Sequence, residues 1–127
     1  MPFDWHNYLA LAEELATRTD EASKRSAISR AYYCVFNLAF ARAESTAGPH
    51  PPEEGYHQWC WRKYQETSDT SCKQLGTDGD RMKRRRVKAD YKAAEIRRLD
   101  EQVHRMLEEV RQFLRDLAAL NPRYPLP

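Results

Sequence analysis

One stretch restricts the fold of this chain more than any other. Residues 21–44 contain neither glycine nor proline, and residues 31–41 within them would be apolar on nearly every side of a helix. Such a helix must be surrounded by other elements, because an exposed side would place apolar groups in water. We therefore expect a central helix over residues 21–44, with Thr19 ending the segment before it and Asp20 as its N-cap.

Two further segments have clear helical periodicity. Residues 4–18 place their apolar side chains on one stripe, and Asp4 is a candidate N-cap. Residues 93–120 carry apolar side chains at alternating spacings of three and four, namely Ile96, Leu99, Val103, Met106, Val110, Phe113, Leu117 and Leu120. This rhythm allows one helix to pack along another in a bundle.

The regions between these helices are shorter and more varied. Residues 45–55 form a proline-rich loop and residues 121–127 a proline-rich tail, because proline cannot continue a helix. Residues 56–67 predict a short helix packed by its aromatic rings, which are Tyr56, Trp59, Trp61 and Tyr64. These rings could instead stack on nucleic-acid bases.

The next segment, residues 68–80, is polar and contains Gly76 and Gly79, which predicts a turn or a short helical piece. Residues 80–89 favour a basic helix. Nowhere do four or more residues alternate between apolar and polar, so no strand is expected. We therefore expect an all-α fold, an up-and-down bundle of four to five helices, in a single domain over residues 1–127.

Composition excludes several classes of protein. The chain has 21 Lys and Arg residues against 19 Asp and Glu residues, so any attraction to nucleic acid must come from a local site. It has no apolar run of membrane-spanning length and no signal-peptide pattern, so we expect a cytoplasmic protein without a membrane partner. Its three cysteines, Cys34, Cys60 and Cys72, lack C-x-x-C spacing, so we expect reduced thiols and no bound metal or cofactor.

A row of polar side chains crosses the apolar central helix. Ser26, Arg30, Tyr33 and Asn37 fall at positions i, i+4, i+7 and i+11, which share one helix face. In a structural interpretation Arg30 is partly buried and pairs with Asp90, because an unpaired buried guanidinium is costly. In a functional interpretation the row lines a crevice in which Arg30 binds a phosphate.

Two other features could carry chemistry. His57 follows the proline-rich loop and could act as a general acid or base, or bond to a helix end. A basic run, whose members are Arg81, Lys83, Arg84, Arg85, Arg86 and Lys88, could bind RNA or nucleotide phosphates. The alternative is a solvated basic helix close to acidic positions of the last helix, which are Glu101, Glu108 and Glu109.

Three sequence blocks together resemble the HEPN family of small helical domains from prokaryotic toxin–antitoxin and defence systems. Residues 25–37 are similar to the family's S-x-x-R-x-Y-Y-x-x-F helix, and His57 is followed after seven residues by Tyr64. Residues 86–91 match R-x-x-A-D-Y, which ends in Asp90 and Tyr91. The resemblance implies a helical bundle that pairs as a homodimer, with RNA cleavage as the activity of many members.

The sequence departs from the family at the Arg-x4-6-His motif of its ribonucleolytic members. The matching spacings are those of Arg97 and Arg98 to His104. Inside a continuous helix Arg97 and His104 would lie roughly 10.5 Å apart along the axis, and Arg98 would point to a different face. Chance accounts for such matches in a chain this rich in arginine. His57 is therefore the first candidate for catalysis.

We expect an RNA-binding protein or a metal-independent ribonuclease of the toxin or defence type. His57 and Arg30 are the candidate catalytic residues, and the candidate phosphate-binding residues are Arg84, Arg85, Arg86 and Lys88. The remaining polar network is expected to be structural and comprises Ser26, Arg30, Tyr33, Asn37, Asp90 and Tyr91. The alternative is a non-catalytic module that binds a nucleotidyltransferase-type partner or a nucleotide.

Overall fold

Five α-helices make up the regular structure of residues 2–127, which the computed structural model describes. In chain order they are α1 (His6–Ala16), α2 (Glu21–Ala47), α3 (Tyr56–Glu66), α4 (Thr70–Tyr91) and α5 (Leu99–Ala119). They pack as a bundle and no strand occurs in the described part of the chain, so the prediction of an all-α fold is confirmed. None of these helices combines the length and the apolar character needed to cross a membrane.

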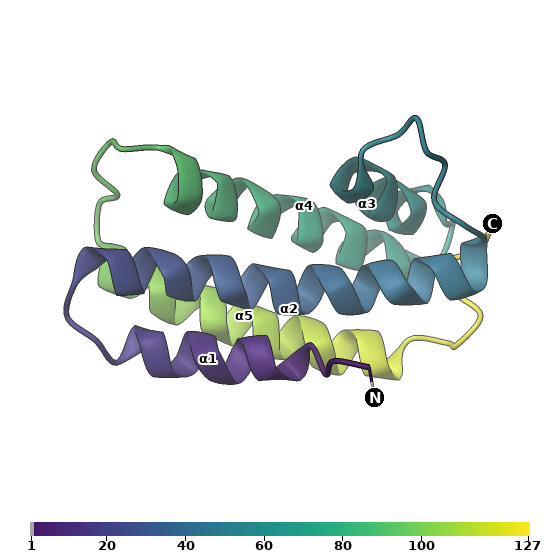
Figure 1. Ribbon diagram of the computed structural model, residues 1–127. Helices are drawn as coiled ribbons and strands as arrows, with labels where there is room; N and C mark the ends of the chain where they lie inside the picture. Colours follow the sequence, from purple (N-terminus) through teal and green to yellow (C-terminus); the bar gives the residue numbers. More distant parts are fainter. Residues whose placement is uncertain (1) are drawn as a thin grey trace.

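The central helix of the bundle is α2, as its apolar circumference predicts. It contacts each of the other four helices, and Figure 1 shows it running the length of the molecule, with α3 and α4 above it and α1 below it. Asp20 is its N-cap and accepts a hydrogen bond from the backbone N–H of Ser23 at 2.9 Å. The helix continues past residue 44 to Ala47 and ends at Gly48, whose φ of 96° favours glycine.

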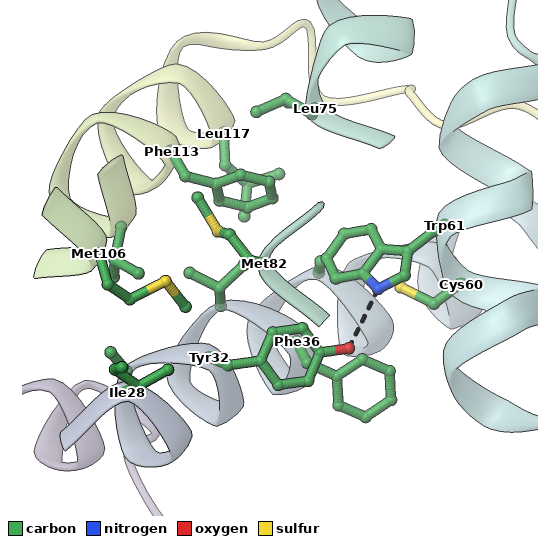
Figure 2. Close-up of a cluster of buried hydrophobic side chains, with 14 of the residues drawn as sticks. Ile28, Tyr32, Phe36, Cys60, Trp61, Leu75, Met82, Met106, Phe113 and Leu117 are labelled. Carbon is green, nitrogen blue, oxygen red and sulfur yellow. Dashed lines mark hydrogen bonds between the residues drawn. The ribbon is translucent and has the colours of Figure 1, made fainter. Parts of the chain in front are cut away.

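The core fills the space between α2 and the three helices that follow it in the chain. Its largest fully buried side chains include Tyr32 of α2, Trp61 of α3, Met82 of α4 and Phe113 of α5 (Figure 2). The Trp61 and Phe113 rings meet edge to face, with their centroids 5.9 Å apart. Of the four aromatic side chains predicted to pack in α3, only Tyr56 is exposed.

The segment expected to hold a turn or a short helical piece is helical and forms the first half of the longer helix α4. Asp69 caps this helix by accepting a backbone N–H from its first turn, and both Gly76 and Gly79 lie inside the helix. A Cβ atom at Gly79 would lie 2.3 Å from the ring of Trp61. The glycine therefore makes room for the indole ring of α3. Of the two alternatives the helical one is correct and the turn is wrong, because this use of glycine depends on a residue far away in sequence.

Two helices start later than the sequence pattern predicts. The N-cap of α1 is Trp5, although the Asp4 side chain still accepts the backbone N–H of His6 at 3.0 Å. The last helix, α5, begins at Leu99, because the residue before it, Arg98, has the left-handed backbone conformation with φ at 54°. Apolar periodicity alone does not reveal such a break.

Two arginines of α2 bind the ends of other helices. Arg25 donates hydrogen bonds to the backbone oxygens at the end of α4, those of Lys88, Ala89, Lys92 and Ala94. Arg42 does the same at the end of α5, where the acceptors are the oxygens of Leu117, Leu120, Asn121 and Tyr124. The last carbonyls of a helix lack partners within it, so these guanidinium groups satisfy them and hold α4 and α5 against α2.

Candidate functional site

Arg86 is the buried polar side chain of this chain whose hydrogen-bonding capacity is least satisfied. It belongs to α4 and is 6% exposed, and its Nε atom is buried without a hydrogen-bond partner in the described residues. Its nearest carboxylate is Asp90, with 3.8 Å between Nη1 and Oδ2. A buried guanidinium with an unused donor costs free energy, and such groups often mark functional sites.

Tyrosine rings surround this guanidinium. Its central carbon lies 5.4 Å from the ring centroid of Tyr32, 5.3 Å from that of Tyr33 and 5.8 Å from that of Tyr91. The negative faces of aromatic rings attract a cation and replace part of its lost hydration. They accept no conventional hydrogen bond from the Nε–H, so a stronger acceptor is still missing.

The expected pair of Arg30 and Asp90 is replaced by two other arrangements. The Asp90 carboxylate accepts a hydrogen bond from the Ser29 hydroxyl at 3.0 Å and faces Arg86 on its own helix. The Arg30 guanidinium lies between two rings, 4.8 Å from the centroid of Tyr8 and 4.9 Å from that of Tyr33. Arg30 and Asp90 still lie on the same side of the bundle, because both contact Ser29.

His57 enters the same region from the first turn of α3. Its Nδ1 lies 2.6 Å from the hydroxyl of Tyr32, which in turn lies 3.1 Å from Nε1 of Trp61 (Figure 2 shows the Trp61 contact). The indole N–H can only donate, so the Tyr32 oxygen accepts from it. Nδ1 of His57 is the one acceptor among the described residues for the proton of this buried hydroxyl, so the Tyr32 hydroxyl donates to Nδ1. We therefore assign the imidazole proton to Nε2.

The surroundings of His57 favour its neutral form. Its ring stacks on Phe36 at 4.0 Å between centroids. Burial, and then the positive charges of Arg86 and Lys83, lower the pKa of His57 from 6.5 to about 4. Burial likewise raises the pKa of Tyr32, so its hydroxyl keeps the proton that it donates. At pH 7 the site holds a neutral imidazole.

The structure separates the basic run into residues with different partners. Arg85 and Arg81 both bind the carboxylate of Glu109, and Arg84 binds Asp80 at 2.6 Å. Arg84, which is exposed, and Arg85, which is half-buried, are therefore each neutralised by a carboxylate. Lys88 is exposed and, with Arg85, lines a cleft of about 290 Å³ between α4 and α5. Of the four candidate phosphate-binding residues, Arg86 alone reaches the region of His57.

Other predicted residues lie elsewhere or contribute little. Ser26 is exposed, and the Asn37 side chain donates a hydrogen bond to the Tyr33 carbonyl on its own helix at 2.8 Å. His104 lies exposed on α5, with its Nε2 3.0 Å from a Glu108 oxygen. We use the name Arg86 site for the residues that the structure brings together, which are Arg30, Tyr33, His57, Lys83, Arg86, Asp90 and Tyr91.

Sequence reasoning did not single out Arg86 as the buried arginine of the basic run, although a signal for it exists. The buried positions of α4 follow a three-and-four spacing through Leu75, Gly79, Met82, Arg86 and Ala89. Arg86 is thus the one arginine of the run that continues the apolar stripe, which predicts that it points into the bundle. Treating the basic run as a single cluster of charges obscured the position of Arg86 on the buried face of the helix.

No group of three or more metal-ligating side chains gathers anywhere in residues 2–127. Comparison of the chain with protein-family models, with curated proteins and with solved structures gives no match. The geometry of the Arg86 site and the three sequence blocks are therefore the grounds on which a function can be proposed.

Proposed function

We propose that this chain is a HEPN-like domain that binds RNA at the Arg86 site without cleaving it. The observation that carries the proposal is the buried Arg86 guanidinium, whose Nε–H has no acceptor in the described chain and whose carboxylate contact is 3.8 Å long. Phosphate is the anion that suits such a weakly paired guanidinium best, because guanidinium groups bind phosphate with paired, charge-assisted hydrogen bonds.

The charges around Arg86 support an anionic ligand. Arg30, Lys83 and Arg86 bring three positive charges to the site, whereas Asp90 is its one carboxylate and His57 is neutral at pH 7. Within residues 2–127 neither Arg30 nor Lys83 forms an ion pair with a carboxylate. A bound phosphate would offset this excess positive charge.

His57 favours binding over cleavage. Metal-independent cleavage of RNA at neutral pH needs a base for the ribose 2′-hydroxyl and an acid for the leaving oxygen. A group with a pKa of about 4 is a weak base at pH 7 and holds no extra proton to donate. The Nδ1 atom is moreover occupied by the Tyr32 hydroxyl. His57 thus positions Tyr32 and presents an N–H at Nε2, which suits a ligand contact.

Binding of a fluorescein-labelled RNA, followed by anisotropy at about 50 and 200 mM salt, tests the proposal. Arg86→Met should weaken binding about tenfold or more, whereas Arg115→Met, which removes an exposed charge from α5, should change it less than about threefold. Circular dichroism establishes that both variants are folded. Equal binding by the two variants would contradict the proposal.

Integrity of the RNA is measured in the same samples. We expect RNA to stay intact in EDTA at high protein concentration. If the unmodified protein produces RNA fragments and His57→Ala does not, the function is metal-independent cleavage and not binding alone. Competition by a free nucleotide at similar concentration would instead favour the module that binds nucleotides. Homodimerisation, a nucleotidyltransferase-type partner, a toxin–antitoxin or defence setting and a cytoplasmic location stay predictions of the resemblance and the composition.

A further inference from the structure

Three aromatic side chains at the start of the described chain form a cluster on the surface. Phe3, Trp5 and Tyr8 have ring centroids 5.0, 5.4 and 5.3 Å apart, and Phe3 is 52% exposed. We call these residues the N-terminal aromatic cluster. Packing of α1 against α2 does not account for Phe3, because about half of this ring remains in contact with water.

The N-terminal aromatic cluster is joined to the Arg86 site by a continuous series of contacts. The Arg30 guanidinium lies 4.8 Å from the Tyr8 centroid and 4.9 Å from the Tyr33 centroid. The Arg86 guanidinium follows at 5.3 Å from Tyr33. Aromatic rings and cations therefore alternate along this path.

We infer that the N-terminal aromatic cluster stacks on bases of the ligand bound at the Arg86 site, and that this ligand is a single-stranded nucleic-acid segment longer than one nucleotide. The inference rests on the proposed function and names the form of the nucleic acid. A single strand presents base faces and phosphates in turn, which matches the alternation of rings and cations. A duplex buries its base faces in the stack, so it could use the cations but not the rings.

Arg30 links the two parts of this surface. Lying between Tyr8 and Tyr33, it is oriented by both rings and forms no ion pair with a carboxylate in the described residues. A phosphate that follows a base stacked on the cluster would find this guanidinium next. This use accounts for an arginine that is held in place on the protein surface without an anionic partner.

Trp5 provides a built-in reporter for the experiment. It is partly exposed, whereas Trp59 and Trp61 are 1% and 2% exposed, so quenching of tryptophan fluorescence by a ligand reports on the cluster. The probes are a ten-nucleotide oligoadenylate, its duplex with oligouridylate, and inorganic phosphate. We expect the single strand to quench the fluorescence and to bind about tenfold or more tightly than the duplex, and phosphate to leave the fluorescence unchanged.

Substitutions separate stacking from simple packing. Phe3→Leu keeps an apolar side chain but removes the ring, and it should weaken binding of the single strand about 5- to 20-fold while leaving duplex binding unchanged. Phe3→Tyr should restore it. Leu11→Ala, which removes an exposed apolar side chain of α1 outside the path, is the control and should have no effect.

The two proposals fail in different ways. If Arg86→Met weakens binding but single strand and duplex bind equally and Phe3→Leu has no effect, the stacking surface is refuted and the RNA-binding proposal stands. If Arg86→Met has no effect on either probe, the proposed function is refuted. Loss of binding in Phe3→Leu that Phe3→Tyr does not restore, accompanied by a lower melting temperature, would assign the ring to packing and also refute the inference.

Discussion

Replacement of Gly79 by alanine should destabilise the protein although it places a better helix former inside a helix. The added Cβ would lie 2.3, 2.4 and 2.5 Å from three carbons of the Trp61 ring, and real Cβ atoms essentially never approach other atoms so closely. The ring itself has little freedom to move, because it is 2% exposed and packs against Phe113 and Tyr64.

Two opposing contributions set the magnitude. Alanine improves intrinsic helix propensity by about 1 kcal/mol relative to glycine. Overpacking of a filled core costs about 1–3 kcal/mol and occasionally more, and three contacts below 3 Å place Gly79→Ala at the upper end of that range. We therefore expect a net loss of about 2 kcal/mol in the free energy of unfolding, or roughly 6–8 °C in melting temperature.

Urea unfolding followed by circular dichroism measures this loss. Thr77→Ala, at an exposed position of the same helix, is the control and should change stability by about 0.5 kcal/mol or less. In a Trp61→Leu background the six-membered ring is gone, so Gly79→Ala should become neutral or stabilising. An equal cost in both backgrounds would refute the steric reasoning, as would a single variant more stable than the original protein.

Three further predictions concern two arginines and the three cysteines. Arg86→Met should leave the free energy of unfolding within about 1 kcal/mol or raise it, because a poorly paired buried charge is replaced by an apolar group; a loss above 3 kcal/mol would make Arg86 structural. Arg42→Met should cost about 2–3 kcal/mol in urea unfolding, because four carbonyls at the end of α5 lose their charged donor. Cys34, Cys60 and Cys72 are buried, and burial raises the pKa of each thiol, so labelling by a disulfide reagent should proceed at the rate of unfolding; fast labelling would contradict this.

The parts of the fold that follow from periodicity could be predicted. The central position of α2 follows from its apolar circumference, and its N-cap at Asp20 from local chemistry. The helical interior around Gly79 could not be predicted, because its cause is the Trp61 ring on another helix. Local sequence shows which backbone conformations glycine allows. The side chains packed around the glycine determine whether it serves a turn or, as at Gly79, makes room for a neighbouring ring.

In the candidate site, too, some features follow from the local sequence and others depend on the packing of distant residues. The expectation that α2 and residues 86–91 face each other agrees with the contact of Ser29 and Asp90. The arginine that faces Asp90 could not be predicted, since Arg30 and Arg86 both lie on the same side of the bundle as Asp90. What separates them is their surroundings, because aromatic rings hold Arg30 away from Asp90 whereas Arg86 faces it. Helix phase singles out Arg86, but the alternative place of Arg30 between two rings depends on α1, whose position relative to α2 the sequence does not encode locally.

The neutral state of His57 makes stability depend on pH in a defined window. Its pKa is about 4 in the folded protein, because of burial and then the charges of Arg86 and Lys83, against 6.5 when it is unperturbed. Above pH 6.5 neither state binds the proton, whereas between pH 6.5 and 4 the unfolded chain binds it and the folded chain does not. The free energy of unfolding therefore falls as the pH is lowered through this window.

The full shift corresponds to about 3 kcal/mol, and partial access of the ring to solvent reduces the expected loss to about 1–2 kcal/mol. Urea unfolding at pH 7, 5.5 and 4.5 measures it. His57→Asn keeps an acceptor for Tyr32 but does not titrate, so subtracting its pH profile removes the contribution of the carboxylates. If the free energy of unfolding changes with pH in the same way in both proteins, folding does not lower the pKa of His57. In that event His57 could exchange protons near pH 7, and the reason for preferring RNA binding to RNA cleavage would be lost.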